Sequence, residues 1–278
     1  MKAAMGVLFL TLSALNTVEA RPGAVAASVE RINRAQASSN APEIVKIARE
    51  FADEILAAHE APRRVTAAVV GLFRKAEALQ AESITPKDAG RIGRLYLMLS
   101  ESYADAAKRY LERSVPETGK ESERVALGNA YLYLGRPKDA RREYLKVSEN
   151  RPQDPVLLVN IALAERALGD TPSAYGRLRQ AMTKTSNPSV ERAAGLAIAE
   201  IQFLSGDLSG AKLQAMKVAE KWPHDVEALW MLKKIYDREG RTDLAKDMDR
   251  RLSALGVRTS VAAGAGKITR QNRKGDQK

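Results

Sequence analysis

Residues 121–154, ESERVALGNAYLYLGRPKDARREYLKVSENRPQD, contain the pattern that decides the fold. Leu127, Gly128 and Tyr131 are spaced as neighbours on one face of a helix, and the small residue lets a second helix approach closely. Gly135 can adopt the left-handed conformation that ends a helix. A second apolar stripe follows at Ala140, Tyr144 and Val147. This stretch therefore predicts a hairpin of two short helices.

The same pattern recurs along the chain. Four glycines are each followed five residues later by an alanine, at Gly135 and Ala140, Gly169 and Ala174, Gly206 and Ala211, and Gly240 and Ala245. The glycines lie 34, 37 and 34 residues apart. Because proline cannot continue a helix, Pro152 and Pro223 close two of the units. A fixed period of this length is typical of proteins built from stacked helical hairpins.

The spacing and residue types resemble the tetratricopeptide repeat (TPR) family, and we expect an exported bacterial type. The resemblance implies an all-α fold, an α-α superhelix of about four to five hairpins over residues 87–259. The predicted units are 87–120, 121–154, 155–188, 192–225 and 226–259, with an insertion at Ser189–Glu191 and a polar last helix that suits a terminal cap. Unit 87–120 is degenerate: Ala106 and Tyr110 fit, but Gly93 and Arg94 stand where a large and a small residue are expected.

The segments on either side of the repeats have different characters. Residues 42–86 predict a helical hairpin that caps the stack, with Asn40 and Pro42 at its start. Residues 1–20 resemble a secretory signal with cleavage after Ala20, which predicts a periplasmic or secreted protein; the alternative is a cytosolic start with a short buried helix. We expect residues 21–41 to be a flexible segment and residues 260–278 to be a basic, disordered tail.

Composition limits the chemistry. The chain has 278 residues, 45% of them hydrophobic and 5% aromatic, and no cysteine, so it has no disulfide, thiol nucleophile or lipid-bearing cysteine. His59 and His224 have no partners at metal-ligand or triad spacing, and no phosphate-binding glycine loop or nucleophile elbow occurs in a folded part of the chain. We therefore predict a protein without catalytic residues, cofactor or metal, and treat an enzyme with a hidden site as the least favoured class.

In the TPR family, the first helices of successive hairpins line a concave groove that receives a peptide or a partner helix. Carrying those positions over predicts the partner-binding residues Val125, Asn129, Tyr133, Val159, Asn160, Leu163, Arg166, Leu196, Glu200, Phe203, Trp230 and Lys234. The result is a largely apolar wall with a few polar groups, which suits an amphipathic helix or an apolar peptide. The alternative is that some of these side chains are core, or are covered by residues 21–39.

Asn129 and Asn160 are spaced like the two asparagines of the carboxylate clamp of heat-shock co-chaperones. That clamp also needs basic residues, and Val125, Ala193 and Ala197 occupy their positions. Since nothing remains to neutralise a carboxylate, the sequence argues against the clamp. Two interpretations of the asparagines remain: they contact the backbone of a bound peptide, or they are ordinary polar residues on the face of a helix.

These observations favour a periplasmic scaffold or adaptor in an envelope assembly, such as a pilus or secretion machine, outer-membrane assembly or polysaccharide export. The alternative is a protein that associates with peptidoglycan or another anionic glycan through its basic end, at Arg258, Lys267, Arg270, Arg273 and Lys274. The chain has a formal net charge of +11, which attracts anionic surfaces, although nucleic acid is not an expected partner of an exported protein. A solvated tail that only aids solubility remains an alternative.

Overall fold

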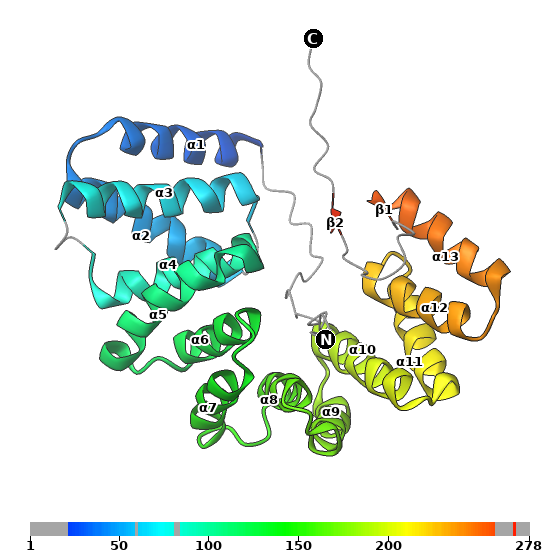
Figure 1. Cartoon of the computed structure of the whole chain (residues 1–278). Coiled ribbons are helices and arrows are strands. Elements are labelled where there is room, and N and C mark those ends of the chain that lie inside the picture. The colour runs from blue at the N-terminus through cyan, green and yellow to red at the C-terminus, as the bar shows by residue number, and fades with distance from the viewer. Residues whose placement is uncertain (1–21, 59–60, 81–83, 259–268, 271–278) are drawn as a thin grey trace, which may run out of the picture. The chain divides into compact units, whose positions relative to one another are not determined.

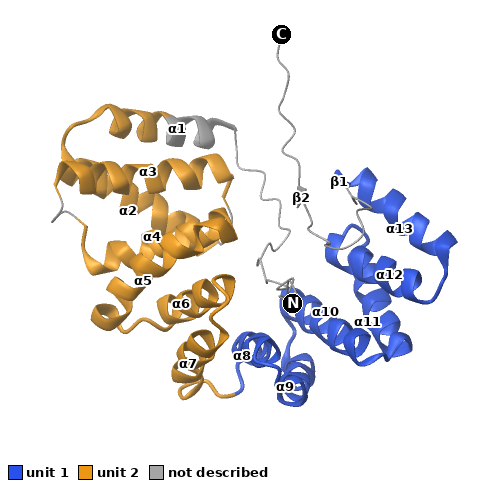
Figure 2. Ribbon diagram, viewed as in Figure 1, with its two compact units in different colours: residues 1–10, 153–278 blue, residues 11–152 orange. Residues whose placement is uncertain are grey.

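A computed structural model describes residues 22–58, 61–80, 84–258 and 269–270. It is built from helices, with one pair of two-residue strands (Figure 1). The chain divides into two compact units between Pro152 and Gln153 (Figure 2). The helices before that point form unit 2, and those after it form unit 1. The predicted signal at residues 1–20 lies outside the described residues.

Unit 2 contains α1 to α7. Its helices are α1 (Pro22–Ala37), α2 (Ala41–Ala58), α3 (Arg63–Leu79), α4 (Pro86–Leu99), α5 (Ala104–Thr118), α6 (Glu121–Tyr133) and α7 (Pro137–Ser148), with a 3-10 turn, η2 (Glu101–Tyr103), before α5. The most extensive packing is within the consecutive pairs α2–α3, α4–α5 and α6–α7, and α5 also packs on α6. These pairs are the predicted helical hairpins.

The expectation of a flexible segment at residues 21–41 is wrong for residues 22–37, which form α1. This helix packs against both α2 and α3, and Ile32 and Ala35 are buried. Arg31 adds an ion pair to Glu50 at 2.5 Å. The helix was missed because its buried face consists of few apolar side chains among alanines and charges. The start of α2 agrees with the prediction, since the Oδ1 of Asn40 accepts a hydrogen bond from the Glu43 N–H at 3.4 Å.

Close packing explains the small residue in the first helices of two hairpins in unit 2, α4–α5 and α6–α7. A Cβ added to Gly128 would lie 2.3 Å from the Tyr144 ring, and one added to Gly93 would lie 2.5 Å from Leu111. Gly93 is therefore the equivalent of Gly128. The hairpin α4–α5 is thus regular in its packing, and the predicted register of unit 87–120 is wrong by one residue: Ala107 and Leu111 are buried where Ala106 and Tyr110 were expected. The spacing from Gly93 to Ala107 is two residues longer than that from Gly128 to Ala140, so a fixed 34-residue repeat does not align the two hairpins.

Unit 1 contains three further hairpins. They pair α8 (Pro155–Ala167) with α9 (Thr171–Lys184), α10 (Pro188–Ser205) with α11 (Leu208–Lys221), and α12 (Val226–Arg238) with α13 (Thr242–Ala254). Side chains of Asp154, Asp170, Asn187, Asp207 and Asp225 accept hydrogen bonds from the first turns of the helices that follow them. The inserted residues 189–191 lie in α10, which has 18 residues where α8 and α12 have 13.

Left-handed glycines end the helices where the sequence predicted them. Gly135 follows α6 with φ 69°, and Gly206 follows α10 with φ 89°. After α13, β1 (Val257–Arg258) pairs antiparallel with β2 (Thr269–Arg270). The rest of the predicted disordered tail lies outside the described residues. The core of unit 1 runs between its helices and includes Leu196, Ala211, Leu229, Leu232 and Leu252.

Candidate partner-binding surface

The predicted wall residues fall on both units. In unit 2 they are Val125, Asn129 and Tyr133 on α6, all of them half-buried. The Tyr144 hydroxyl, which lies on a fully buried side chain of α7, donates a hydrogen bond to Asn129 Oδ1 at 2.7 Å. The carbonyl of Asn129 therefore has a partner within its own hairpin, which supports a structural role for this asparagine.

In unit 1 the first helices of the three hairpins lie side by side. Helix α10 contacts α8 on one side and α12 on the other. An ion pair between Arg166 and Glu200 joins α8 to α10. Arg192 of α10 bonds Glu227 at the start of α12 at 2.8 Å, and Arg238 at the end of α12 lies 5.1 Å from the centre of the Phe203 ring. Since starts meet starts and ends meet ends, α10 and α12 run parallel.

We call the surface formed by these three helices the inner face of unit 1. It includes nine of the predicted partner-binding residues: Val159, Asn160, Leu163, Arg166, Leu196, Glu200, Phe203, Trp230 and Lys234. The exposure of these side chains to solvent differs among α8, α10 and α12. Val159, Leu163 and Leu196 are buried, which agrees with the alternative that part of the wall is packed inside. Phe203 and Trp230 are half-buried against the core, and Lys234 is exposed.

Leu204 was missed by the sequence analysis. It lies in the last turn of α10 and is 68% exposed, more than any other large hydrophobic side chain in the described residues. It follows Glu200 by four residues and Leu196 by eight, so the helical period places all three on one side of α10. That spacing is the signal that would have identified it.

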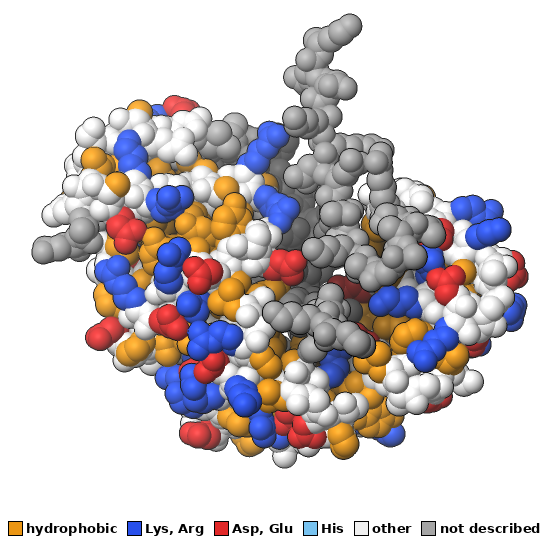
Figure 3. Space-filling model, in the orientation of Figure 1, with side chains coloured by type: hydrophobic (Ala, Val, Ile, Leu, Met, Phe, Trp, Pro, Cys, Tyr) orange, Lys and Arg blue, Asp and Glu red, His pale blue; other side chains and the backbone are white. Residues whose placement is uncertain are grey.

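On the described surface of the molecule, apolar side chains lie interleaved with charged ones (Figure 3).

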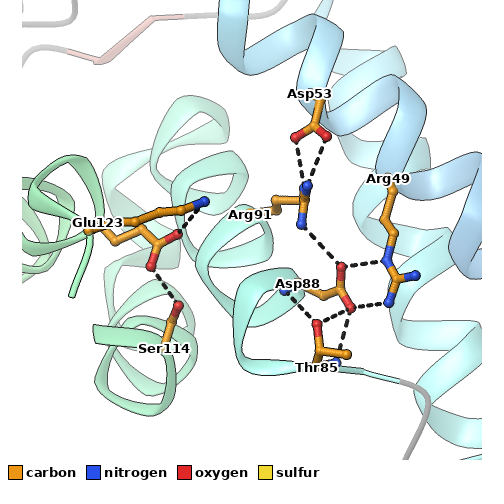
Figure 4. Close-up of polar contacts among 8 residues, drawn as sticks. Arg49, Asp53, Thr85, Asp88, Arg91, Ser114 and Glu123 are labelled. Carbon is orange, nitrogen blue, oxygen red and sulfur yellow. Dashed lines mark hydrogen bonds and ion pairs between the residues drawn. The ribbon is translucent and has the colours of Figure 1, made fainter. Parts of the chain in front are cut away.

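The densest polar cluster lies in unit 2, away from the predicted wall residues (Figure 4). Asp88 of α4 is completely buried; its carboxylate accepts hydrogen bonds from Arg49 at 2.7 and 2.8 Å and from Thr85, and lies 3.4 Å from Arg91. Arg91 in turn bonds Asp53 at 2.7 Å. These contacts connect α2 to the N-terminus of α4, where Thr85 and Asp88 form a capping box.

The charges of this cluster neutralise one another. Burial raises the pKa of Asp88, but hydrogen bonds from Arg49 and Thr85 outweigh it, so the pKa lies below its ordinary value. A hydrogen bond from Arg91 lowers the pKa of Asp53 in the same way. Nearby, Glu123 accepts from Ser114 at 2.7 Å and from Thr118 at 2.5 Å. Because each carboxylate has partners from the chain itself, we assign the cluster to the stability of unit 2.

The two histidines and the basic residues of the C-terminal end lie partly outside the described residues. His224 is exposed, and His59 lies outside the described residues. Of the basic residues proposed to meet an anionic surface, Arg258 and Arg270 belong to the strand pair, and Lys267, Arg273 and Lys274 lie outside the described part of the chain. Within the described residues, no three His, Asp or Glu side chains are grouped to hold a metal ion. No described helix combines the length and the apolar character needed to cross a membrane.

The structure has the fold of tetratricopeptide repeat proteins. No protein-family model and no curated protein matches the chain. Among solved structures, PilW, described as a widely conserved type IV pilus biogenesis factor, matches with a TM-score of 0.58 and 15% identity over 75% of this chain and 92% of its own. A tetratricopeptide repeat protein from Parabacteroides merdae matches with a TM-score of 0.57 and 12% identity over 83% and 94%.

A third similar structure is the Cut9–Hcn1 hetero-tetramer of the APC/C. It matches with a TM-score of 0.60 and 13% identity over 84% of this chain and 43% of the other. At these identities the likeness establishes the fold, an all-α solenoid of helical hairpins, and leaves the partner open.

Proposed function

We propose that this chain is a periplasmic scaffold that holds a segment of a partner protein against the inner face of unit 1, as a component of an envelope assembly. The observation that carries the proposal is the combination of Leu204, 68% exposed, with the half-buried Phe203 and Trp230 on adjacent parallel helices. Exposed apolar side chains gathered on one face and bordered by charges are typical of protein-binding surfaces.

The charges at the border suit such a role. Lys234 is exposed on the same helix as Trp230 and four residues beyond it, so the two lie on one side of α12. Glu200, paired with Arg166, lies between Leu196 and Leu204 along α10. An apolar centre with charged neighbours binds an apolar segment and sets its orientation through the charges.

The envelope location rests on the sequence. Residues 1–20 have the basic start, the apolar stretch and the small residues at 18 and 20 that a signal peptidase recognises. PilW and the Pseudomonas aeruginosa PilF protein share the fold, and PilW is described as a pilus biogenesis factor. Pilus assembly is therefore one setting to test first, beside secretion, outer-membrane assembly and polysaccharide export.

The test is a comparison of two charge substitutions in unit 1. Leu204→Glu places a carboxylate on the inner face, whereas Leu213→Glu makes the same change on α11 at a side chain that is 54% exposed. Partners are first identified by crosslinking in envelope extract and mass spectrometry, and one of them is then purified. We expect Leu204→Glu to weaken its binding about tenfold or more, and Leu213→Glu to leave it unchanged.

Circular dichroism spectra and thermal unfolding of both variants show whether they remain folded. Equal binding by both variants, or loss of binding in Leu213→Glu alone, contradicts the proposed surface. A protein that is found in the cytoplasm by fractionation, with residues 1–20 retained, contradicts the proposed location and leaves the surface to be judged by the binding data.

A further inference from the structure

Three tyrosines of unit 2 lie ring against ring where α3 and α5 meet. The ring of Tyr96, on α4, has its centre 5.5 Å from that of Tyr103 and 5.9 Å from that of Tyr110. The hydroxyl of Tyr110, on α5, donates a hydrogen bond to Glu77 of α3 at 2.8 Å, which places the cluster at the junction of these two helices. None of these side chains belongs to α8, α10 or α12, so the cluster is independent of the proposed function.

Tyr103 is the ring that is most open to a ligand. It is 45% exposed, whereas Tyr96 is 7% exposed and Tyr110 is half-buried. The Tyr110 hydroxyl is occupied by Glu77, but the hydroxyl of Tyr103 has no partner in the described part of the chain. The inner rings therefore support an exposed aromatic side chain that keeps a free hydroxyl.

A positive charge lies beside these rings. Arg74 is exposed and forms no hydrogen bond or ion pair within the described residues. It precedes Glu77 by three residues, so it lies on the side of α3 that meets Tyr110. Burial raises the pKa of the Tyr96 hydroxyl, and the nearby charges of Arg74 and Arg109 oppose that rise. Since α3 contains four basic residues and one acidic residue, its side of the cluster is positively charged.

The chemistry of these groups suits an acidic sugar. The face of an aromatic ring is negative, so it attracts the C–H groups on the flat side of a pyranose ring. A guanidinium donates two parallel hydrogen bonds to a carboxylate. A peptide that binds through apolar side chains needs a wider apolar patch. The other exposed large hydrophobic side chains described in unit 2 are Leu79, the last residue of α3, and Leu145 on α7, so Tyr103 is not part of such a patch.

We propose that Tyr103 and Arg74 of unit 2 bind an acidic polysaccharide, with the Tyr103 ring stacked on one sugar and Arg74 paired with a carboxylate of that sugar or its neighbour. This site lies on folded helices and is separate from the basic residues at the C-terminal end. Contact with a single sugar is weak, and the repeating units of a polymer raise the overall affinity because many equivalent sugars are within reach.

The experiment uses the full chain and three polymers of similar length. Polygalacturonate has sugar rings and carboxylates, its methyl ester has the rings without the charge, and poly-L-glutamate has carboxylates without the rings. Binding is measured by biolayer interferometry at a salt concentration of about 0.15 M. The variants are Tyr103→Leu, Tyr103→Phe and Arg74→Gln, with Arg179→Gln as a matched change at an exposed arginine on α9. Circular dichroism shows whether each variant is folded.

We expect polygalacturonate to bind more tightly than either of the other polymers. Tyr103→Leu and Arg74→Gln should each weaken its binding about three- to tenfold, whereas Tyr103→Phe, which keeps the ring, and Arg179→Gln should change it by less than about twofold. Glu101→Gln, which removes an exposed carboxylate two residues before Tyr103, should strengthen binding.

The proposal is overturned if none of the polymers binds, or if polygalacturonate binds equally well to the unaltered chain, Tyr103→Leu and Arg74→Gln. Poly-L-glutamate that binds as tightly as polygalacturonate also overturns it, because the attraction would then be one of charge to any acidic polymer, an acidic peptide included. None of these outcomes affects the surface proposed on unit 1, which the Leu204→Glu comparison tests separately.

Discussion

The polar side chains on the first helices of the hairpins differ between the two units in their hydrogen bonding. In unit 2, Asp88, Glu123 and Asn129 each accept hydrogen bonds from neighbouring side chains of the same unit. In unit 1, Glu165 of α8 accepts from Arg177 in the same way, but the Nε–H of Arg166 is buried without a partner and Asn160, 6% exposed, makes no hydrogen bond within the described residues. Exposed apolar area follows the same division along the first helices, since Leu204 belongs to α10 of unit 1.

This difference separates a region that stabilises itself from one that is available to bind. A buried polar group that is paired contributes to stability, whereas an unpaired one costs free energy until a ligand supplies the partner. We infer that the first helices of unit 2 use their polar side chains for folding and that unit 1 keeps binding capacity on α8 and α10.

Removing the charge of Asp88 should have the largest effect on stability. In Asp88→Asn, Arg49 and Arg91 lose the carboxylate that neutralises them, and an amide cannot accept all the bonds that the carboxylate accepts. Breaking such a pair costs about 3 kcal/mol, the low end of the usual range because Arg49 is partly exposed. Hydrogen exchange followed by mass spectrometry should show faster exchange in α2 and α4.

The tryptophans provide an internal comparison for this variant. Both tryptophans of the chain, Trp222 and Trp230, lie in unit 1, so their fluorescence reports on that unit while circular dichroism reports on all helices. A matched surface change is Arg34→Ala, which removes an exposed ion pair with Glu30 and should cost at most about 0.5 kcal/mol. Equal stability of Asp88→Asn and Arg34→Ala would contradict the role given to the cluster.

A methyl group at Gly128 should have the next largest effect. The Cβ of Gly128→Ala would lie 2.3 Å from the buried ring of Tyr144, so the hairpin must open or the ring must move. Overpacking of this kind costs about 1–3 kcal/mol. Gly71→Ala in α3 is the control, because nothing lies within 4 Å of its added Cβ, and there we expect a gain of up to about 1 kcal/mol. Chemical denaturation of both variants measures the difference.

A smaller effect is expected from acid. The folded-state pKa values of Asp88 and Asp53 are lowered, so the folded chain binds fewer protons at these groups than the unfolded chain. Their stabilisation is present above the ordinary pKa of about 4 and is lost as the pH falls through the lowered values. The protection of amides in α2 and α4, measured relative to the intrinsic exchange rate at each pH, should fall below that pH, and the fall should be smaller in Asp88→Asn. An unchanged pH dependence in that variant would disprove the assignment.

The repeats could be predicted from sequence because their signals are local. A left-handed glycine, a small residue at the helix crossing and a proline at the end of a unit each act within a few residues, and Gly128 and Gly135 do what the spacing indicated. Helix α1 was missed because its packing depends on α2 and α3, which lie later in the sequence. The register of the hairpin α4–α5 was predicted wrongly because its two helices are joined by a longer segment, which includes η2.

The candidate site could be predicted only in outline. The twelve wall residues follow from the repeat register, but an apolar residue on a first helix has the same pattern whether it is covered or open. Val159 and Leu163 are buried, while Leu204, the residue after the last expected position on α10, is exposed. Asn129 has a hydrogen-bond partner because Tyr144 lies opposite it on the second helix of the same hairpin. The sequence of the first helix alone does not indicate this contact.

The two asparagines provide the most direct test of the contrast between the units, with the smallest effects. Asn129→Leu leaves the buried hydroxyl of Tyr144 without an acceptor and should cost about 1–2 kcal/mol. Asn160→Leu removes an amide that has no partner and adds apolar contact of similar volume, so stability should stay the same or rise by up to about 1 kcal/mol. Denaturation of the two variants, done in parallel without ligand, compares the same substitution on a first helix of each unit. A loss at Asn160 as large as that at Asn129 would mean that Asn160 stabilises the fold, and the contrast between self-sufficient first helices in unit 2 and binding ones in unit 1 would lose its main support.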